Sequence, residues 1–185
     1  MKKLLCGLFI LISYTSFAQE TIKEPEFAGE VFILQPDGTH VKLEKENAKI
    51  KSKSGLSLIV TGYGTVKVKL NIKGCCSNSN ISSEGELKMI VRAIDNNMDP
   101  LDIIQVFKLE QKKSKRSAEL ASYGSFNGSS ENNLDNLAFN AEKYGENSYL
   151  LTINNFERNR EYGIIVKNNN MPIQATTFVS TFAIN

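Results

Sequence analysis

The chain has 185 residues, of which 22 are lysine or arginine and 20 are aspartate or glutamate, and its formal net charge is +2. Two of the lysines, Lys2 and Lys3, lie in an N-terminal segment that we expect to be removed, which would leave 20 charges of each sign. This balance argues against nucleic acid as a partner, because nucleic-acid binding requires a basic surface on the mature domain.

The first residues, "MKKLLCGLFILISYTSFAQE", have the pattern of a signal peptide. A short basic stretch precedes an apolar run over residues 4–12, which is too short to cross a bilayer as a mature helix. The small residues Ser16 and Ala18 stand at the positions that signal peptidase reads. We therefore predict a signal peptide over residues 1–18 and a single domain over residues 19–185.

Export would place the domain in a secreted or periplasmic compartment. A lipid anchor would need a cysteine directly after the cleavage site, whereas Cys6 lies inside the apolar run. We therefore expect no membrane insertion after the signal is cleaved.

The rest of the chain alternates between apolar and polar residues, which is typical of half-buried strands. In "TVKVKLNIK", residues 65–73, valine, leucine and isoleucine alternate with lysine and asparagine. Asp37 and Gly38 predict a tight turn between two such segments, because glycine accepts a positive φ. The predicted strands cover residues 29–35, 40–46, 55–64, 65–73, 85–94, 102–111, 116–126, 147–154, 161–168 and 176–184.

These segments are short and separated by turn-rich stretches, so we predict an all-β fold. The expected architecture is an antiparallel two-sheet β-sandwich, immunoglobulin/fibronectin-like or jelly-roll-like. The best candidate for a helical turn is the segment over residues 132–145.

Two adjacent cysteines, Cys75 and Cys76, lie in "LNIKGCCSNSNISS", where the pattern predicts the tip of a β-hairpin. They are the only cysteines of the predicted mature chain, so a long-range intrachain disulfide is not available. Three states stay open: a strained vicinal disulfide, two free or capped thiols, or disulfides to another chain. An oxidising compartment favours the first, whereas a metal or redox centre lacks a third ligand and a nearby base.

The run "QKKSKRS" is the main basic stretch that would survive export. Lys112, Lys113, Lys115 and Arg116 would either contact an anionic surface, such as lipid headgroups or acidic glycans, or form the solvated tip of a hairpin.

Two tyrosines beside glycine, Tyr63 and Tyr123, are candidates for ligand contact. On a loop, such a ring would stack against a sugar, although a tyrosine more often packs its ring and leaves its hydroxyl in water.

Few residues suggest catalysis. A nucleophilic centre would have to use His40, the only histidine, which follows the predicted turn and reads as a surface residue. Three carboxylate pairs would suit glycoside hydrolysis or would simply be surface charge. These pairs are Glu142 with Glu146, Glu157 with Glu161, and Asp95 with Asp99. We expect no enzymatic activity, no metal and no cofactor.

Four short stretches, "EPEF", "KGCC", "VRAIDNNMDP" and "EYGIIVKN", resemble a group of uncharacterised secreted bacterial β-sandwich proteins. The resemblance implies secretion and an all-β fold, and it implies no activity. In addition, "FERNREY" resembles the sheet-to-sheet corner of fibronectin type III-like domains, with Phe156 and Tyr162 at the two matching positions. This second resemblance implies that the Tyr162 hydroxyl bonds back to nearby backbone, although the usual Pro-Gly between the two positions is missing.

The sequence therefore predicts a secreted, non-catalytic module that binds a glycan, a protein or a cell-envelope component. The alternatives are an envelope hydrolase built on the paired carboxylates and a structural accessory subunit of a surface assembly.

Overall fold

The computed structural model describes residues 22–54, 64–83, 85–124, 130–167 and 176–185. The predicted signal peptide, most of the predicted strand over residues 55–64 and Tyr63 lie outside the described residues.

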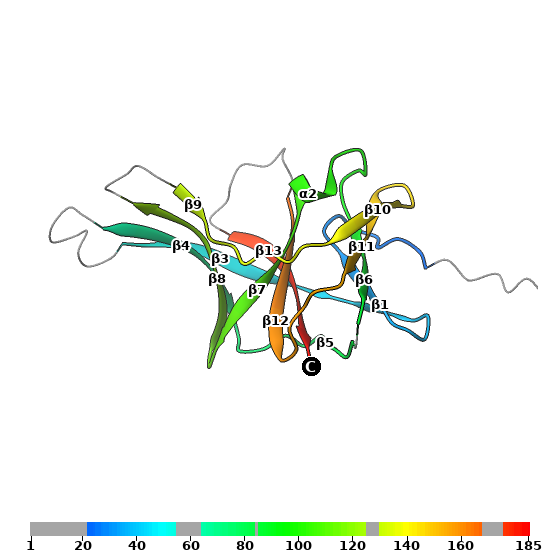
Figure 1. Cartoon of the computed structure of the whole chain (residues 1–185), viewed down its shortest axis with the longest axis horizontal. Coiled ribbons are helices and arrows are strands. Elements are labelled where there is room, and N and C mark those ends of the chain that lie inside the picture. The colour runs from blue at the N-terminus through cyan, green and yellow to red at the C-terminus, as the bar shows by residue number, and fades with distance from the viewer. Residues whose placement is uncertain (1–21, 55–63, 84, 125–129, 168–175) are drawn as a thin grey trace, which may run out of the picture.

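The described strands form two sheets (Figure 1). The first sheet has the order β10 (Asn140–Tyr144), β11 (Ser148–Ile153), β6 (Leu87–Arg92), β1 (Val31–Leu34) and β2 (His40–Lys42). The second sheet has the order β12 (Arg160–Val166), β7 (Ile104–Lys112), β8 (Lys115–Gly124), β4 (Thr65–Lys73), β3 (Glu44–Ser54) and β13 (Thr176–Ile184). Two short strands extend it, since β5 (Asn80–Ile81) pairs in parallel with β13 and β9 (Ser130–Asn132) pairs with β8.

The second sheet closes on itself. β12 pairs with β7 along one edge and with β13 along the other, so the strands from β12 round to β13 form a six-stranded ring, which we call the barrel. The predicted all-β, antiparallel fold is confirmed, but the plain two-sheet sandwich is wrong. A sandwich would leave two edges on the larger sheet, whereas in the barrel those two edges pair with each other.

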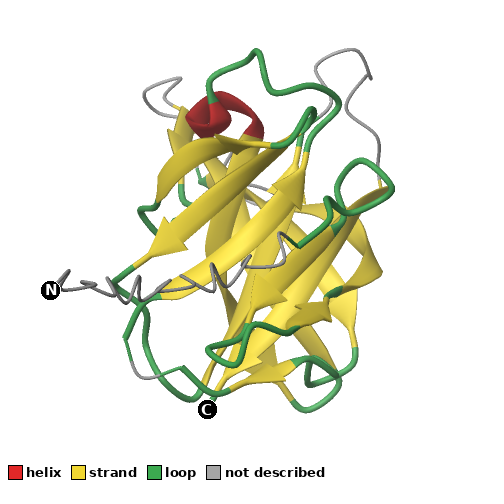
Figure 2. Cartoon of the chain, turned by 90° about the vertical axis from the view of Figure 1, so that its right-hand side faces the viewer, coloured by secondary structure: helices red, strands yellow, loops and turns green. Residues whose placement is uncertain are grey.

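Three barrel strands, β7, β12 and β13, form the wall that faces the first sheet, and Figure 2 views the molecule from the side of the first sheet. Their side chains alternate between two cores. Val106, Ile164 and Phe182 pack against the first sheet, whereas Phe107 and Val179 pack inside the barrel. Where these strands lie between the two cores, they are buried on both faces. Towards one end of each strand, β7 and β13 have exposed residues such as Glu110 and Phe178.

The opposite wall consists of β3, β4 and β8, which extend away from the first sheet (Figure 1). The apolar residues of these strands point into the barrel, namely Ala48, Leu70, Ile72 and Ala118. Their neighbours along each strand point to the outer side of the barrel. This half-wet wall follows the period-two pattern that the sequence shows at residues 65–73.

Three local predictions need correction. The predicted strand over residues 40–46 is two strands, because the chain crosses from the first sheet to the barrel at the buried Leu43. The segment over residues 132–145 contains β10 and no helix. The strands before and after the cysteines do not form a hairpin, since β4 lies in the barrel and β6 in the first sheet.

The only helix among the described residues is the single turn α2 (Pro100–Ile103), whose first amides are capped by the Asp99 side chain. No described helix has the length and apolar character needed to cross a bilayer.

The link from β11 to β12 crosses between the two sheets at a tyrosine. The Tyr162 hydroxyl donates to the Glu157 carbonyl at 2.9 Å and accepts from the Glu157 amide at 2.7 Å. Phe156 packs against the core shared by the two sheets. The hydrogen bond that the fibronectin-like corner implied is therefore present in the structure. Because Tyr162 is fully buried, its hydroxyl is the group that satisfies these two backbone atoms at the crossing.

Replacing Tyr162 by Phe should lower the free energy of unfolding by about 1–3 kcal/mol, because the Glu157 amide and carbonyl lose a buried partner. Urea unfolding would measure this. Tyr123→Phe is the matched control, since the side chain is 49% exposed and the change should have almost no effect. Equal stability of the two variants would contradict a structural role for the corner.

Candidate functional site

One outward face of the barrel is dominated by lysine. Alternate residues of β3, β4 and the β7–β8 hairpin point away from the barrel interior. We call the set of lysines at these positions the lysine face. Its members are Lys49, Lys51, Lys53, Lys67, Lys69, Lys73, Lys112 and Lys115.

Several of these lysines stand directly opposite one another. Lys51 pairs in register with Lys69, and Lys53 pairs with Lys67. At the other end of the face, Lys115 lies between Lys73 and Lys112. Cross-strand neighbours have Cβ atoms roughly 4.5–5.5 Å apart, and like charges in this arrangement destabilise a sheet. The lysine face therefore carries an electrostatic cost that the fold itself does not require.

Two acidic residues partly neutralise the face. The Glu119 carboxylate lies 3.1 Å from the Lys67 Nζ and 3.4 Å from the Lys69 Nζ. Its partial burial would raise its pKa, but hydrogen bonds from Asn133 and the two lysines hold the pKa below its ordinary value. Glu110 lies 3.7 Å from the Lys112 Nζ.

Four other lysines of the face have no acidic partner among the residues that the structure describes. All four are exposed: Lys49, Lys51, Lys53 and Lys73. Positive charge is therefore concentrated on this wall.

Neutral groups lie among the lysines. Asn71 pairs in register with Lys49 on one side and Ser117 on the other, and its side-chain oxygen accepts a hydrogen bond from the Lys115 Nζ at 3.1 Å. On the neighbouring strand β13, Phe178 is opposite Asn47 and is 65% exposed. An aromatic ring thus borders the lysine face.

The predicted basic run divides between two environments. Lys112 and Lys115 belong to the lysine face, and Lys113 is exposed in the turn between β7 and β8. The prediction for Arg116 is wrong: its side chain is 1% exposed and points into the barrel, because it is the next residue after the outward Lys115 on the same strand. Arg116 is not available to an anionic surface.

Arg116 instead organises the end of the barrel. Its Nη2 donates to both oxygens of the Glu46 carboxylate at 2.7 Å, and its Nη1 donates to the Thr181 hydroxyl at 3.0 Å. The Glu161 carboxylate lies 3.5 Å from Nη1. Burial raises the pKa of Glu161, against the lowering effects of the Ser77 amide and Arg116. Arg116 thus forms ion pairs with two acidic side chains, Glu46 and Glu161.

The cysteines lie in the turn that closes this end. Cys75 and Cys76 form a vicinal disulfide, with Cys76 exposed and its Sγ accepting from the Gln111 Nε2 at 3.3 Å. The next amide, that of Ser77, donates to both Glu161 oxygens at 3.1 Å. The turn joins β4 to β5 and covers the buried Arg116–Glu161 pair, so its position indicates a structural role beside the lysine face.

The tyrosine and histidine candidates lie elsewhere. Tyr123 is opposite Val66 and so projects from the surface of the sheet that is opposite to the lysine face. His40 is exposed at the start of β2, where its ring stacks on Phe32. A single ligand on the lysine face would therefore not reach either residue across the sheet.

The two members of a predicted carboxylate pair do not share one environment where the structure shows their contacts. Glu157 is exposed and ion-paired with Lys108 and Arg160, whereas Glu161 is inside the barrel. Asp99 caps α2, and the Asp95 side chain accepts from the Asn97 amide. Glu142 and Glu146 are both exposed.

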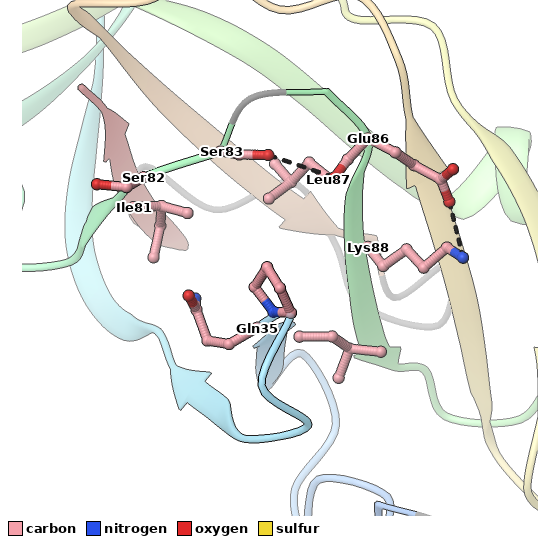
Figure 3. Close-up of a pocket in the computed structure, with 9 residues that line it drawn as sticks. Gln35, Ile81, Ser82, Ser83, Glu86, Leu87 and Lys88 are labelled. Atoms are coloured by element: carbon pink, nitrogen blue, oxygen red, sulfur yellow. Dashed lines mark hydrogen bonds and ion pairs between the residues drawn. The ribbon is translucent and has the colours of Figure 1, made fainter.

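A shallow cavity lies between the ends of β1, β5 and β6 (Figure 3). It measures about 250 Å³, which is less than the ~300–1,000 Å³ typical of ligand pockets. Its charged groups pair with each other, since the Glu86 carboxylate lies 2.8 Å from the Lys88 Nζ, and the Ser83 hydroxyl donates to the Glu86 carbonyl. The cavity is therefore small, and the two charged side chains that line it are already paired with each other.

A scan against protein-family models found no match, and a search of curated proteins found no similar sequence. The lysine face and its surroundings are therefore the main indication of function.

The sequence analysis misses the lysines of β3 because it predicts no strand over residues 47–54. A signal is present: in "KIKSK", residues 49–53, lysine occupies every second position, as it does at residues 67 and 69. Two such segments in neighbouring antiparallel strands would have predicted a shared basic face.

Replacing Arg116 by Ala should destabilise the protein by about 3–5 kcal/mol, because Glu161 would be left buried without its cation. Lys115→Ala is the control, since it is the adjacent, exposed residue and should change stability by only about 0.5 kcal/mol. Chemical denaturation would measure both, and similar values for the two variants would contradict the buried network.

Glu161 should give the stability a distinct pH dependence. Its folded-state pKa lies above the ordinary value of 4.5, so the stability that it contributes is fully present below that value and is lost as the pH rises through the folded pKa. Glu161→Gln cannot titrate. The free energy of unfolding of the wild type minus that of the variant should therefore fall with rising pH, as measured by urea unfolding between about pH 4 and 8. A difference that rises with pH would show that the carboxyl is stabilised as an anion.

Proposed function

We propose that the protein acts outside the cytoplasm as a non-catalytic binding module, and that its lysine face holds an anionic component of the cell envelope. The observation that carries the proposal is the set of directly opposed lysines, Lys51 with Lys69, Lys53 with Lys67 and Lys115 with Lys73 and Lys112.

Each opposed pair of lysines lowers the stability of the free protein and raises its affinity for an anionic partner. Repulsion across the sheet opposes folding, and a polyanion laid over the face removes that repulsion. Binding would also release the counterions that the partner holds, so the affinity would fall steeply with salt. The barrel supplies a rigid support, because the inner side of the same strands is packed with apolar residues.

Export is supported by the N-terminal pattern and by the cysteines. A vicinal disulfide suits an oxidising compartment, where disulfides persist. The cell envelope is rich in acidic polymers and headgroups, and an exported basic face would meet them there.

A binding role is favoured over hydrolysis by the contacts of the acids. Glu157 and Glu161 project into different environments, and Asp99 is engaged at the start of α2. Glycoside hydrolysis needs two carboxyl groups on opposite sides of one scissile bond, whereas the Glu157–Glu161 and Asp95–Asp99 pairs make other contacts.

The proposal predicts salt-dependent binding of a polyanion through the lysine face. Long-chain inorganic polyphosphate is a suitable probe, because it offers charge alone. The double variant Lys51→Glu/Lys69→Glu should bind it at least tenfold more weakly than the wild type, with a shallower dependence of log Kd on log salt concentration. Fluorescence anisotropy or calorimetry of the exported protein would measure both.

The matched control is Lys88→Glu/Lys143→Glu, which changes the net charge equally but lies on β6 and β10 of the first sheet. The control should bind polyphosphate nearly as well as the wild type. Equal losses in the two double variants would mean that only net charge matters, and the lysine face would not be a site.

A further inference from the structure

We infer that the anionic partner of the lysine face is an acidic polysaccharide, whose chain lies along β3 and β4 and packs a sugar ring on Phe178. This inference rests on the proposed function and names the class of ligand for the same surface.

The first observation is the position of Phe178. It is the third residue of β13, opposite Asn47, and two residues from the position opposite Lys49. Diagonal neighbours across an antiparallel pair are about 7–8 Å apart, so the ring and the Lys49 ammonium are within reach of one sugar unit and its acidic substituent. Phe178 is 65% exposed, although the adjacent Val179 is completely buried.

The second observation is the set of neutral polar groups between the cations. Asn47 and Asn71 point outward from two adjacent strands, in register with Phe178 and Lys49. Their amide groups match the hydroxyls of a sugar, whereas a partner recognised by charge alone has no use for them. The combination of cations, amides and one aromatic ring fits a polymer that has anionic groups, hydroxyls and apolar ring faces.

A lipid surface fits this arrangement less well. Interfacial binding buries apolar side chains about 5–10 Å into the headgroup and acyl boundary. Phe178 lies in the body of a strand, so reaching that depth would sink Asn47 and the neighbouring lysines with it. Of the other exposed large hydrophobics among the described residues, Tyr123 projects from the opposite surface of the sheet, and Ile94, Met98 and Leu101 lie outside the barrel strands. Phe27 precedes the segment over residues 28–29, which contacts Lys45 and Ser180 beside the face.

Single-stranded nucleic acid is also a poorer match. Proteins that bind it stack successive bases on several aromatic side chains, and Phe178 is the only exposed aromatic on the described part of this face. Charge and one ring are enough for a polysaccharide, which offers alternating apolar faces and acidic groups.

The test compares charge and ring contacts on separate probes. The exported protein, Phe178→Ala and the Lys51→Glu/Lys69→Glu variant are titrated with polyphosphate, an oligogalacturonate, a heparin oligosaccharide, phosphatidylglycerol vesicles and oligo-dT. Tyr123→Ala is the control for losing an exposed aromatic ring, since Tyr123 is 49% exposed and projects from the surface of the sheet that is opposite to the lysine face.

We expect Phe178→Ala to weaken binding of at least one acidic oligosaccharide by about fivefold to tenfold and to leave polyphosphate binding unchanged. Tyr123→Ala should change neither. The lysine variant should lose both kinds of ligand.

Three outcomes would overturn the inference while leaving the proposed function in place. Phe178→Ala could bind every acidic oligosaccharide as the wild type does, its loss could be confined to vesicles, or its loss could be confined to oligo-dT. Failure of the proposed function has a different signature, because the lysine variant would then bind polyphosphate as tightly as the wild type.

Discussion

The structure depends on three strands, β7, β12 and β13, whose central side chains are buried on both faces. In β7, Val106 packs against the first sheet and Phe107 packs inside the barrel. In β12, Gly163 makes this double burial possible, because a Cβ at that position would lie within 3.0 Å of the Phe107 ring and of Val179. A strand that is apolar on both faces needs cover on both. The closing of the barrel covers one face, and the first sheet covers the other.

This arrangement leaves the far wall of the barrel with only one side to bury. The inner side of β3, β4 and β8 completes the barrel core, and the outer side has no packing requirement. The residues there are free to serve a partner, and they are largely lysine. The barrel end is closed by polar contacts, in which Arg116 holds Glu46 and Glu161 and the cysteine turn delivers the Ser77 amide. The fold thus separates a buried, paired cation from an outer surface whose lysines are only partly neutralised by Glu119 and Glu110.

The sequence predicted the strands well where one face is wet and poorly where the chain changes sheets. The alternation at residues 65–73 identified β4, and the predicted strand over residues 176–184 matched β13. The crossing at Leu43 carries no turn residue, so one predicted strand covered two. Closure of the barrel depends on the pairing of β12 with β13, a contact between whole strands that no local pattern records. The sequence likewise placed Lys112 and Lys115 at the surface but gave Arg116 the same role, because a run of four basic residues does not reveal which way each one points.

The choice of lysine over arginine on the barrel separates two kinds of recognition. Arginine presents a planar fork that binds a carboxylate in one fixed geometry. Arginine occurs inside the barrel, where Arg116 contacts both oxygens of the Glu46 carboxylate in one fixed arrangement. Every cation of the lysine face is instead a compact charge on a flexible stem, which follows an anionic group over several ångströms without demanding an orientation. Such a surface would bind a polymer through the density of its positive charge, and the bound polymer would be able to slide along it. The contacts that distinguish one polyanion from another would therefore have to come from groups such as Phe178 and Asn71.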